Sequence, residues 1–244
     1  MPDRRPESRA NPAAHLERAG TFPEVIAHRG ANREAPENTL PAFEAAVRLG
    51  ADGIELDIQM TADGMPVVHH DARLPDRAGP GLQISALTHS EVTRLSALPT
   101  LGEVIESVGR RCRLYVEIKA PDAIEAVLTL LRPLGESCAV HAFDHRVIAR
   151  ARVLAPAIPR GILLVSHLLD AAAVMRAVGA RDLWQHVDMV DRELIDGVHS
   201  GGGRVICWTA NDPSRARRLI SMGVDGLCTD TPRELRQVVD ASQC

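Results

Sequence analysis

The run GADGIELDIQMTADGMPVVHHD, from Gly50 to Asp71, contains residues that hydrophobic packing does not require. Glu55, Asp57 and His70 interrupt its apolar pattern. In an extended strand, residues two apart point to the same face, so Glu55 and Asp57 share one face while their aliphatic neighbours share the other. Two carboxylates held side by side in a protein interior repel each other and lose solvation unless positive charge lies between them. The run therefore indicates a cation or a basic side chain beside these acids.

A second segment, RLYVEIK, repeats this arrangement, because Glu117 and Lys119 also share one strand face. A third carboxylate near Glu55 and Asp57 favours a hard divalent cation, Mg²⁺ or Ca²⁺, since these ions prefer oxygen ligands. Lys119 is then in position to meet an anion. The alternative, from these residues alone, is a buried network of ion pairs without a metal.

A third segment, VIAHRG, ends in His28 and Arg29. Imidazoles at the ends of neighbouring strands, His28 and His70, are able to accept and to donate a proton. Arg29 and Lys119 would add fixed positive charge, and arginine suits bidentate contact with phosphate oxygens. A metal, two cations and two imidazoles together predict chemistry on a phosphoester. His69 has the opposite strand parity to His70 and is predicted to be structural.

Several parallel strands are needed to gather these side chains at one edge. From Phe22 onward, short aliphatic or β-branched runs alternate with helical patterns, which is typical of repeated βα units. About eight such units predict an α/β fold of the (β/α)₈ TIM barrel type. The candidate strands are VIAHRG (from Val25), GIELDIQ (Gly53) continued by PVVHH (Pro66), RLYVEIK (Arg113), CAVHAF (Cys138), RGILLV (Arg160), VDMV (Val187), RVICWTA (Arg204) and DGLCTD (Asp225).

An open doubly wound sheet is the alternative fold. Against it, no GxGxxG follows the first strand, and the polar residues end many strands rather than one switch point. The polar segment from Asp71 to Pro99, with several Pro and Gly, is predicted to be a short irregular insertion after the second strand, with one short helix beside the active site. The expected organisation is a flexible N-terminal extension, residues 1–22, and one barrel domain, residues 23–244.

Composition narrows the classes of partner. The 244 residues have a net charge of −4 and no dense basic block, which argues against nucleic acid. No run has the character of a signal peptide or a membrane span, so we expect a cytoplasmic protein without integral membrane association. The sequence indicates no oligomeric state. Its five cysteines lack CxxC spacing and are expected to be reduced core thiols: Cys112, Cys138, Cys207, Cys228 and Cys244.

A series of motifs spans nearly the whole chain from Val25 to the C-terminal helix. They are AHRG (Ala27 to Gly30), PENT (Pro36 to Thr39), ELDIQMTADGMPVVHHD (Glu55 to Asp71), PTLGEVI (Pro99 to Ile105), EIK (Glu117 to Lys119), WTAN (Trp208 to Asn211) and GVDGLCTDTP (Gly223 to Pro232). In this order the motifs resemble those of the glycerophosphodiester phosphodiesterases. Each motif alone is weak, but the combination is specific.

The resemblance implies a TIM barrel that hydrolyses glycerophosphodiesters, such as glycerophosphocholine or glycerophosphoethanolamine, to glycerol 3-phosphate and an alcohol. Asn38 or Thr39 could equally be a helix N-cap, and Trp208 a core residue. By position, the resemblance assigns roles as follows: His28 and His70 as the acid/base pair; Glu55, Asp57 and Glu117 as ligands of one divalent cation, Mg²⁺ or Ca²⁺; Arg29, Lys119, Glu37, Asn38 and Trp208 as substrate or phosphate contacts.

Two features depart from the family pattern. The segment after Asp71 is shorter than usual, which would leave the mouth of the barrel more open. After the fourth strand the family often has Ser-Phe, where this chain has Ala142-Phe143 preceded by His141. The alternative enzyme is a phospholipase D of the related barrel type, acting on lysophospholipids or sphingolipids. The non-enzymatic alternative is a barrel that only binds phosphate compounds.

Overall fold

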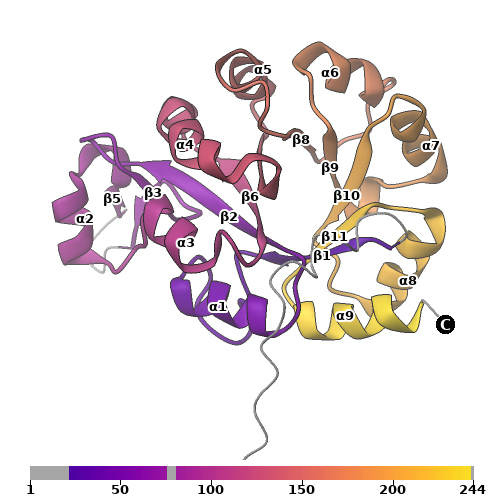
Figure 1. Ribbon diagram of the computed structural model, residues 1–244, viewed down its shortest axis with the longest axis horizontal. Helices are drawn as coiled ribbons and strands as arrows, with labels where there is room; N and C mark the ends of the chain where they lie inside the picture. Colours follow the sequence, from indigo (N-terminus) through magenta and orange to yellow (C-terminus); the bar gives the residue numbers. More distant parts are fainter. Residues whose placement is uncertain (1–21, 76–80, 243–244) are drawn as a thin grey trace, which may run out of the picture.

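The computed structural model describes residues 22–75 and 81–242, which form a barrel of parallel strands inside a ring of helices (Figure 1). The predicted N-terminal extension lies outside these residues, apart from Phe22. The barrel closes because β1 pairs in parallel with both β2 and β11. Its eight strands are β1 (Glu24–His28), β2 (Gly53–Met60), β6 (Arg113–Ile118), β7 (Cys138–Ala142), β8 (Arg160–Leu164), β9 (Asp182–His186), β10 (Arg204–Trp208) and β11 (Gly226–Thr229). The predicted (β/α)₈ barrel is confirmed.

Helices surround the strands in chain order from α1 to α9 (Figure 1). Many begin at a Thr or Asp whose side chain accepts a backbone N–H of the first turn, as Thr100 does for α3 in a capping box with Glu103. The ring consists of α1 (Leu40–Arg48), α3 (Leu101–Val108), α4 (Ile124–Leu131), α5 (His145–Leu154), α6 (Ala171–Val178), α7 (Arg192–Ser200), α8 (Pro213–Met222) and α9 (Pro232–Ala241).

Because side chains along each strand point alternately outward and inward, the barrel has two separate hydrophobic cores. Residues of one parity, such as Leu56 of β2, pack outward between the sheet and the helices. Residues of the other parity fill the barrel itself, where Trp184 and Tyr115 meet edge to face with ring centroids 5.1 Å apart. The interior is therefore a packed plug, and polar inward-facing residues gather at its two ends.

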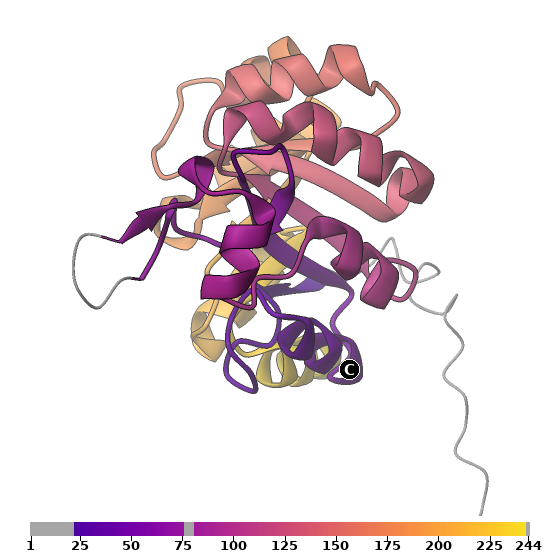
Figure 2. The same ribbon diagram turned by 90° about the vertical axis from the view of Figure 1, so that its left-hand side faces the viewer.

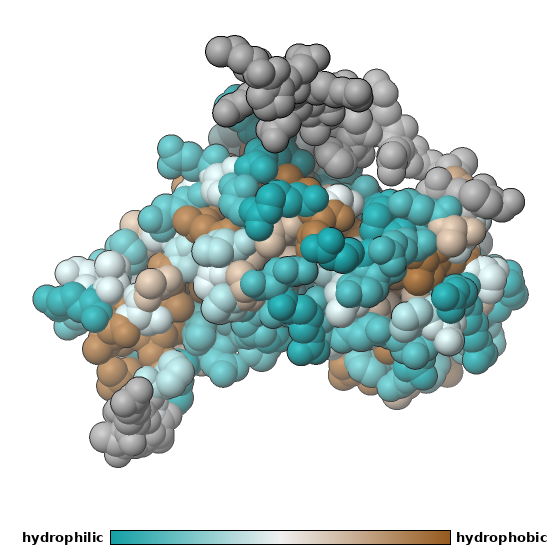
Figure 3. All heavy atoms as spheres, turned by 90° about the horizontal axis from the view of Figure 1, so that it is seen from below, coloured by the Kyte–Doolittle hydropathy of each residue, from teal (hydrophilic) through white to brown (hydrophobic). Residues whose placement is uncertain are grey.

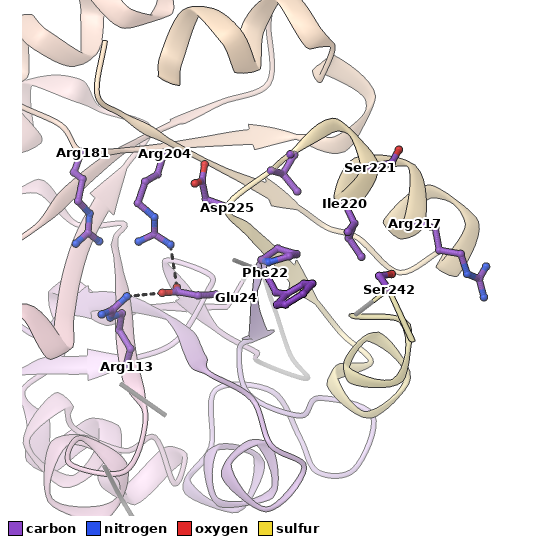
Figure 4. A pocket seen from close by; sticks show the side chains of 13 residues that line it. Phe22, Glu24, Arg113, Arg181, Arg204, Arg217, Ile220, Ser221, Asp225 and Ser242 are labelled. Carbon is purple, nitrogen blue, oxygen red and sulfur yellow. Dashed lines mark hydrogen bonds and ion pairs between the residues drawn. The ribbon is translucent and has the colours of Figure 1, made fainter. Parts of the chain in front are cut away.

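Charged residues at the N-terminal end of the barrel are paired with one another. Glu24 lies 2.5 Å from Arg113 and 3.3 Å from Arg204 (Figure 4). It also accepts a hydrogen bond from the Tyr115 hydroxyl. Burial raises the pKa of Glu24, but the two guanidinium groups outweigh it and hold the pKa below its ordinary value. These residues line part of a pocket of about 770 Å³. These charged residues therefore pair with one another, and this pairing explains why they are partly buried at this end of the barrel.

The segment after β2 forms an appendage at one side of the barrel (Figure 2). Its described part has a small core of its own, which includes Val67 and Val92. Figure 3 shows an apolar area on the left of the molecule. Two leucines of this segment, Leu82 and Leu95, are exposed. The predicted insertion with one short α-helix is confirmed. It comprises β3 (Pro66–Val68), β4 (Arg73–Leu74), β5 (Leu82–Gln83), a 3₁₀ turn (Ile84–Ala86) and α2 (His89–Leu95).

Two predicted strand positions are wrong. The strand expected at VDMV from Val187 is a 3₁₀ turn, and β9 occupies the five residues before it. PVVHH does not continue β2 but turns back as β3, which pairs antiparallel with the end of β2. Gly64, at φ of 80°, supports the turn between them because glycine adopts this left-handed conformation without steric strain.

No helix within residues 22–75 and 81–242 has the length and apolar character of a membrane span. The four cysteines in the same ranges, Cys112, Cys138, Cys207 and Cys228, are buried free thiols, as predicted. Cys244 lies outside the described residues.

Candidate active site

The register of four neighbouring strands brings the predicted residues to one level of the barrel. His28 of β1 lies beside Glu55 of β2, and Asp57 lies beside Glu117 of β6. On the next strand, β7, His141 lies beside Glu117. His28, Glu117 and His141 are at or next to the C-terminal ends of their strands, which is where barrel enzymes carry their active sites. Strand β2 continues beyond Asp57, where it pairs with β3.

The turn after β1 places Arg29 over the two acids of β2. Arg29 has a φ of 57° and Gly30 a φ of 83°, and a Cβ on Gly30 would lie 2.8 Å from the carbonyl carbon of Ala42. This conformation lets the Arg29 N–H donate to Glu55 at 3.0 Å while the guanidinium lies 3.2 Å from Asp57. A non-glycine residue at such a φ costs about 1 kcal/mol or more, which these contacts must offset.

The PENT segment supplies a second strained residue to the site. Asn38 also has a φ of 57°, is 3% exposed, and donates its side-chain N–H to Asp57 at 2.8 Å. Glu37 lies at the rim and accepts from the Arg29 guanidinium at 2.9 Å. Thr39 is the N-cap of α1, because its hydroxyl accepts from a first-turn N–H. Between the two residues that the sequence left open, Thr39 caps the helix and Asn38 belongs to the site.

Asp57 is surrounded by positive charge. Its Oδ1 lies 3.3 Å from Lys119 Nζ, and its Oδ2 faces Arg29 and Asn38. Burial raises the pKa of Asp57, but Lys119 and Arg29 outweigh burial, so the pKa lies below its ordinary value. Lys119 is the single lysine in a chain whose other basic residues are arginines and histidines, and it also lies 2.6 Å from Glu117. Asp57 is therefore ionised and compensated by protein groups.

Glu55 lacks a comparable partner. It is fully buried, and burial together with the charges of Asp57 and Glu117 raises its pKa well above the ordinary value. Burial likewise raises the pKa of Glu117. Glu55, Glu117 and His141 each direct one ligand atom into a common space, and these atoms lie within 4.8 Å of one another. Glu117 shares the single charge of Lys119 with Asp57, and no lysine or arginine side chain among the described residues pairs with Glu55. Buried carboxylates with converging oxygens and so little positive charge fit a bound cation, because its charge would offset their desolvation.

His28 is held by a carboxylate from the last strand. Its Nδ1 lies 2.8 Å from Asp230, which also accepts from Asn32 and Asn211 at 2.6 and 2.7 Å. Burial raises the pKa of Asp230, but these hydrogen bonds and the imidazole outweigh it and hold the pKa below its ordinary value. An ionised Asp230 favours a proton on Nδ1 of His28. The opposite nitrogen, Nε2, then faces the acids, 4.0 Å from Glu55.

His70 lies on the appendage side of the mouth rather than on a barrel strand. Its Nδ1 lies 2.8 Å from Asp71, and its backbone carbonyl accepts from Gln59 of β2 at 2.9 Å. The His69 N–H donates to the carbonyl of Asp57, so this residue fixes the segment to β2. His28 and His70 thus have the same arrangement, an imidazole whose Nδ1 meets a carboxylate.

Trp208 forms an aromatic rim at the end of β10. It meets Phe143 and His186 edge to face, with ring centroids 5.7 and 5.4 Å apart. Trp208 also packs against the apolar plug of the barrel, so it joins the core to the mouth. Phe143, which is 45% exposed, lies 5.8 Å from Lys119 Nζ.

The sequence assigned no role to two residues that the geometry brings into the site, Asp230 and His141. Asp230 follows the last strand directly, and His141 has the parity of Ala139, which faces the barrel interior. The rule that singled out Glu55 and Asp57, a polar residue facing inward near a strand's C-terminal end, would have found both. The hydrophobicity of the strands alone does not identify these residues, because a single polar residue changes little in an otherwise apolar strand.

Comparisons with known proteins place the chain in a family. Residues 28–234 match the model of the glycerophosphoryl diester phosphodiesterase family. The chain is 33% identical to a glycerophosphodiester phosphodiesterase of Caldanaerobacter subterraneus subsp. tengcongensis, over 88% of this chain and 97% of that protein. A phosphodiesterase of Oleispira antarctica, solved in complex with the product sn-glycerol-3-phosphate, superposes with a TM-score of 0.82 at 27% identity, over 90% of this chain and 97% of the other.

A Thermotoga maritima glycerophosphodiester phosphodiesterase is similar as well, with a TM-score of 0.77 at 26% identity, over 88% of this chain and 98% of that one. The fold and these matches define a TIM-barrel phosphoric diester hydrolase. The chain belongs to the glycerophosphoryl diester phosphodiesterase family.

Proposed function

We propose that this enzyme hydrolyses glycerophosphodiesters, such as glycerophosphocholine and glycerophosphoethanolamine, to glycerol 3-phosphate and an alcohol, with a divalent cation bound at the mouth. One observation carries the proposal: His28, an imidazole oriented by a carboxylate, faces the buried acid Glu55, beside Arg29 and Lys119. The product bound to the Oleispira relative supports the same substrate class for this chain.

The balance of charge supports the need for a cation. Glu55, Asp57 and Glu117 are three carboxylates, whereas Arg29 and Lys119 are two basic groups, and both of these already face Asp57. A phosphodiester anion would therefore meet a mouth without surplus positive charge. A divalent cation held by Glu55 and Glu117, with Asp57 beside them, would make the net charge of the mouth positive. It would also polarise a phosphate oxygen and lower the pKa of a bound hydroxyl.

Arg29 and Lys119 are proposed to bind the phosphate oxygens. Arg29 reaches the mouth from β1 and Lys119 from β6, so their positive groups flank Asp57 from two sides. Phosphate oxygens would share these donors with Asp57, which keeps both side chains oriented before substrate arrives. Glu37 and Asn38 would act through them, Glu37 by orienting Arg29 and Asn38 by orienting Asp57.

His28 and His70 are proposed to move the protons. One imidazole takes the proton of the glycerol 2-hydroxyl as that oxygen attacks phosphorus, and the other protonates the leaving alcohol oxygen. Water then opens the resulting cyclic phosphate, and the two imidazoles exchange roles. The contacts of His28 with Asp230 and of His70 with Asp71 support this, because each favours the Nδ1–H tautomer and leaves Nε2 available.

Two further expectations belong to the proposal. Trp208, with Phe143, would form the wall for the glycerol or the head group, since aromatic faces bind apolar surfaces and quaternary ammonium groups. A reducing compartment, the cytoplasm, is the proposed location, and the buried free thiols are what supports it.

The test is release of glycerol 3-phosphate from glycerophosphocholine, with lysophosphatidylcholine in parallel. His28→Ala and His70→Ala should each lower turnover on the order of 10²-fold or more. His199→Ala is the matched control, because His199 also meets a carboxylate, Asp225 at 2.8 Å, but far from the mouth. Turnover confined to lysophosphatidylcholine would favour the phospholipase D alternative. Binding without turnover in the presence of cation would favour a non-enzymatic barrel.

A further inference from the structure

We propose that His141 is a nitrogen ligand of the cation, so that the site prefers a transition metal such as Mn²⁺ over Ca²⁺. The inference rests on the proposed function only in placing a cation between Glu55 and Glu117. It goes beyond that function by naming a further ligand and the class of metal. The ligand set would be two carboxylates and one imidazole, rather than carboxylates alone.

The geometry of the three groups carries the inference. Nε2 of His141 lies 4.0 Å from Oε1 of Glu55, and the ligand atoms of Glu55, Glu117 and His141 all lie within 4.8 Å of one another. Metal–ligand bonds of about 2.0–2.2 Å place two ligand atoms of one ion roughly 3–4.4 Å apart. A shift of a few tenths of an ångström would therefore complete the site. Register explains the convergence, since His141 is paired with Glu117 across β6 and β7.

The state of His141 fits a ligand better than a core residue. The side chain is 1% exposed, and its ring stacks on Trp184 with centroids 4.2 Å apart and planes 9° apart. Among the described residues, the buried Nδ1 has no hydrogen-bond partner, and Nε2 lies 4.0 Å from Oε1 of Glu55. The stacked ring thus holds Nε2 beside one of the acids.

An imidazole ligand changes which ions bind well. Mg²⁺ and Ca²⁺ are hard ions that take oxygen ligands, whereas imidazole nitrogen suits first-row transition metals. Mn²⁺ accepts carboxylate and imidazole together, so it fits a mixed set of two oxygens and one nitrogen.

Metal binding without substrate tests the inference. Metal-stripped wild-type protein, His141→Phe and His199→Phe would be titrated with Mn²⁺ and with Ca²⁺ by calorimetry. Phenylalanine keeps an aromatic ring that can stack on Trp184 and removes both nitrogens. His141→Phe should weaken Mn²⁺ binding at least about tenfold, the range seen when supporting metal contacts are lost, and should change Ca²⁺ binding much less. His199→Phe should bind both ions like wild type.

Pulsed electron paramagnetic resonance gives a direct readout on the wild type. Mn²⁺ bound to the protein should show coupling to a directly coordinated imidazole nitrogen, and His141→Phe should lose it. A wild-type spectrum without nitrogen coupling would overturn the inference even if His141→Phe failed to fold, and so would coupling that persists in a folded His141→Phe. Hydrolysis of glycerophosphocholine without the nitrogen signal leaves the proposed function standing. The signal without hydrolysis would contradict the function alone.

Discussion

Nδ1 of His28 lies 2.8 Å from the carboxylate of Asp230, although 202 residues separate them in the chain. Closure of the barrel makes this contact, because β1 is the neighbour of the last strand, β11, as well as of β2. The first and last strands thus together hold the imidazole of His28, the proposed acid or base. If His28 has that role, the activity requires the closed barrel rather than the motifs of the N-terminal half alone.

Asp230→Asn should lower turnover of glycerophosphocholine by on the order of 10² to 10⁴-fold, the range expected when an imidazole loses the carboxylate that fixes its tautomer. The amide can offer an N–H to Nδ1 of His28 and so favour the wrong tautomer. The measurement is steady-state kinetics, beside Asp225→Asn, which alters the pair of Asp225 and His199 at the opposite end. An equal loss of turnover in both variants would mean that Asp230→Asn acts by lowering the stability of the protein.

The Asp230 contacts also predict a pH dependence of stability. The pKa of Asp230 is lower in the folded chain than its ordinary value of about 3.9, so ionised Asp230 stabilises the fold above that pH. As pH falls below about 4, toward the folded pKa, this contribution is lost. Chemical unfolding should therefore show wild type to be more stable than Asp230→Asn at pH 7, with the difference shrinking at acid pH. A difference that grows on acidification would contradict the assignment.

Strand prediction from the sequence failed where polar residues are buried. β9 was missed because it contains Asp182 and Gln185, each with no solvent exposure, whereas the neighbouring VDMV has the alternating pattern of a strand. Arg181 lies 2.7 Å from Asp182 and provides the charge that makes this burial tolerable. A second partner, Arg204 at 3.6 Å from Asp182, comes from the neighbouring strand β10, so periodicity alone could not predict it.

The residues of the candidate site could be predicted more completely than the boundaries of the strands. Parity along β2 and β6 was enough to place Glu55, Asp57 and Glu117 together, because register in a closed barrel preserves parity between neighbours. Parity could not show that Asp57 is compensated by protein cations while Glu55 is not. That difference arises from the strained turn at Arg29, whose φ of 57° no pattern of residue types reveals.

Lys119→Met should destabilise the protein by about 2–4 kcal/mol and raise KM for glycerophosphodiesters. Methionine keeps the apolar stem but removes the charge that Asp57 and Glu117 both face. Because Lys119 is the only lysine, reductive methylation with ¹³C-formaldehyde gives one ε-amine resonance, apart from any N-terminal amine. That resonance should shift on addition of glycerol 3-phosphate. An unchanged resonance at saturating ligand would remove Lys119 from the phosphate contacts.

Glu55→Gln should stabilise the metal-free protein by about 1–2 kcal/mol at pH 7–8 while lowering turnover sharply. The pKa of Glu55 is raised by burial, so its carboxyl favours folding only when protonated, and that contribution is lost as pH rises. Glutamine retains an acceptor for the Arg29 N–H and carries no charge. Thermal unfolding in chelator is the measurement, and the gain should vanish at acid pH. Destabilisation at pH 7–8 would indicate that the ionised carboxylate is compensated.

Trp208→Ala should raise KM for glycerophosphocholine several-fold or more, because removal of the indole opens the aromatic wall that Phe143 completes. Loss of contacts with the barrel plug should also cost about 3 kcal/mol of stability, so Trp208→Phe is the matched variant that keeps an aromatic face. Kinetics of both variants separate the two effects. A normal KM in Trp208→Ala would place the head group elsewhere.

The central claim is that a divalent cation at Glu55 and Glu117 is required for hydrolysis of a glycerophosphodiester. The most direct measurement follows ³¹P resonances during incubation of glycerophosphocholine with metal-stripped protein, before and after addition of a divalent cation. The account predicts no conversion in chelator, and a glycerol 3-phosphate resonance that appears only after cation is restored. Equal conversion in chelator and in added cation would contradict it.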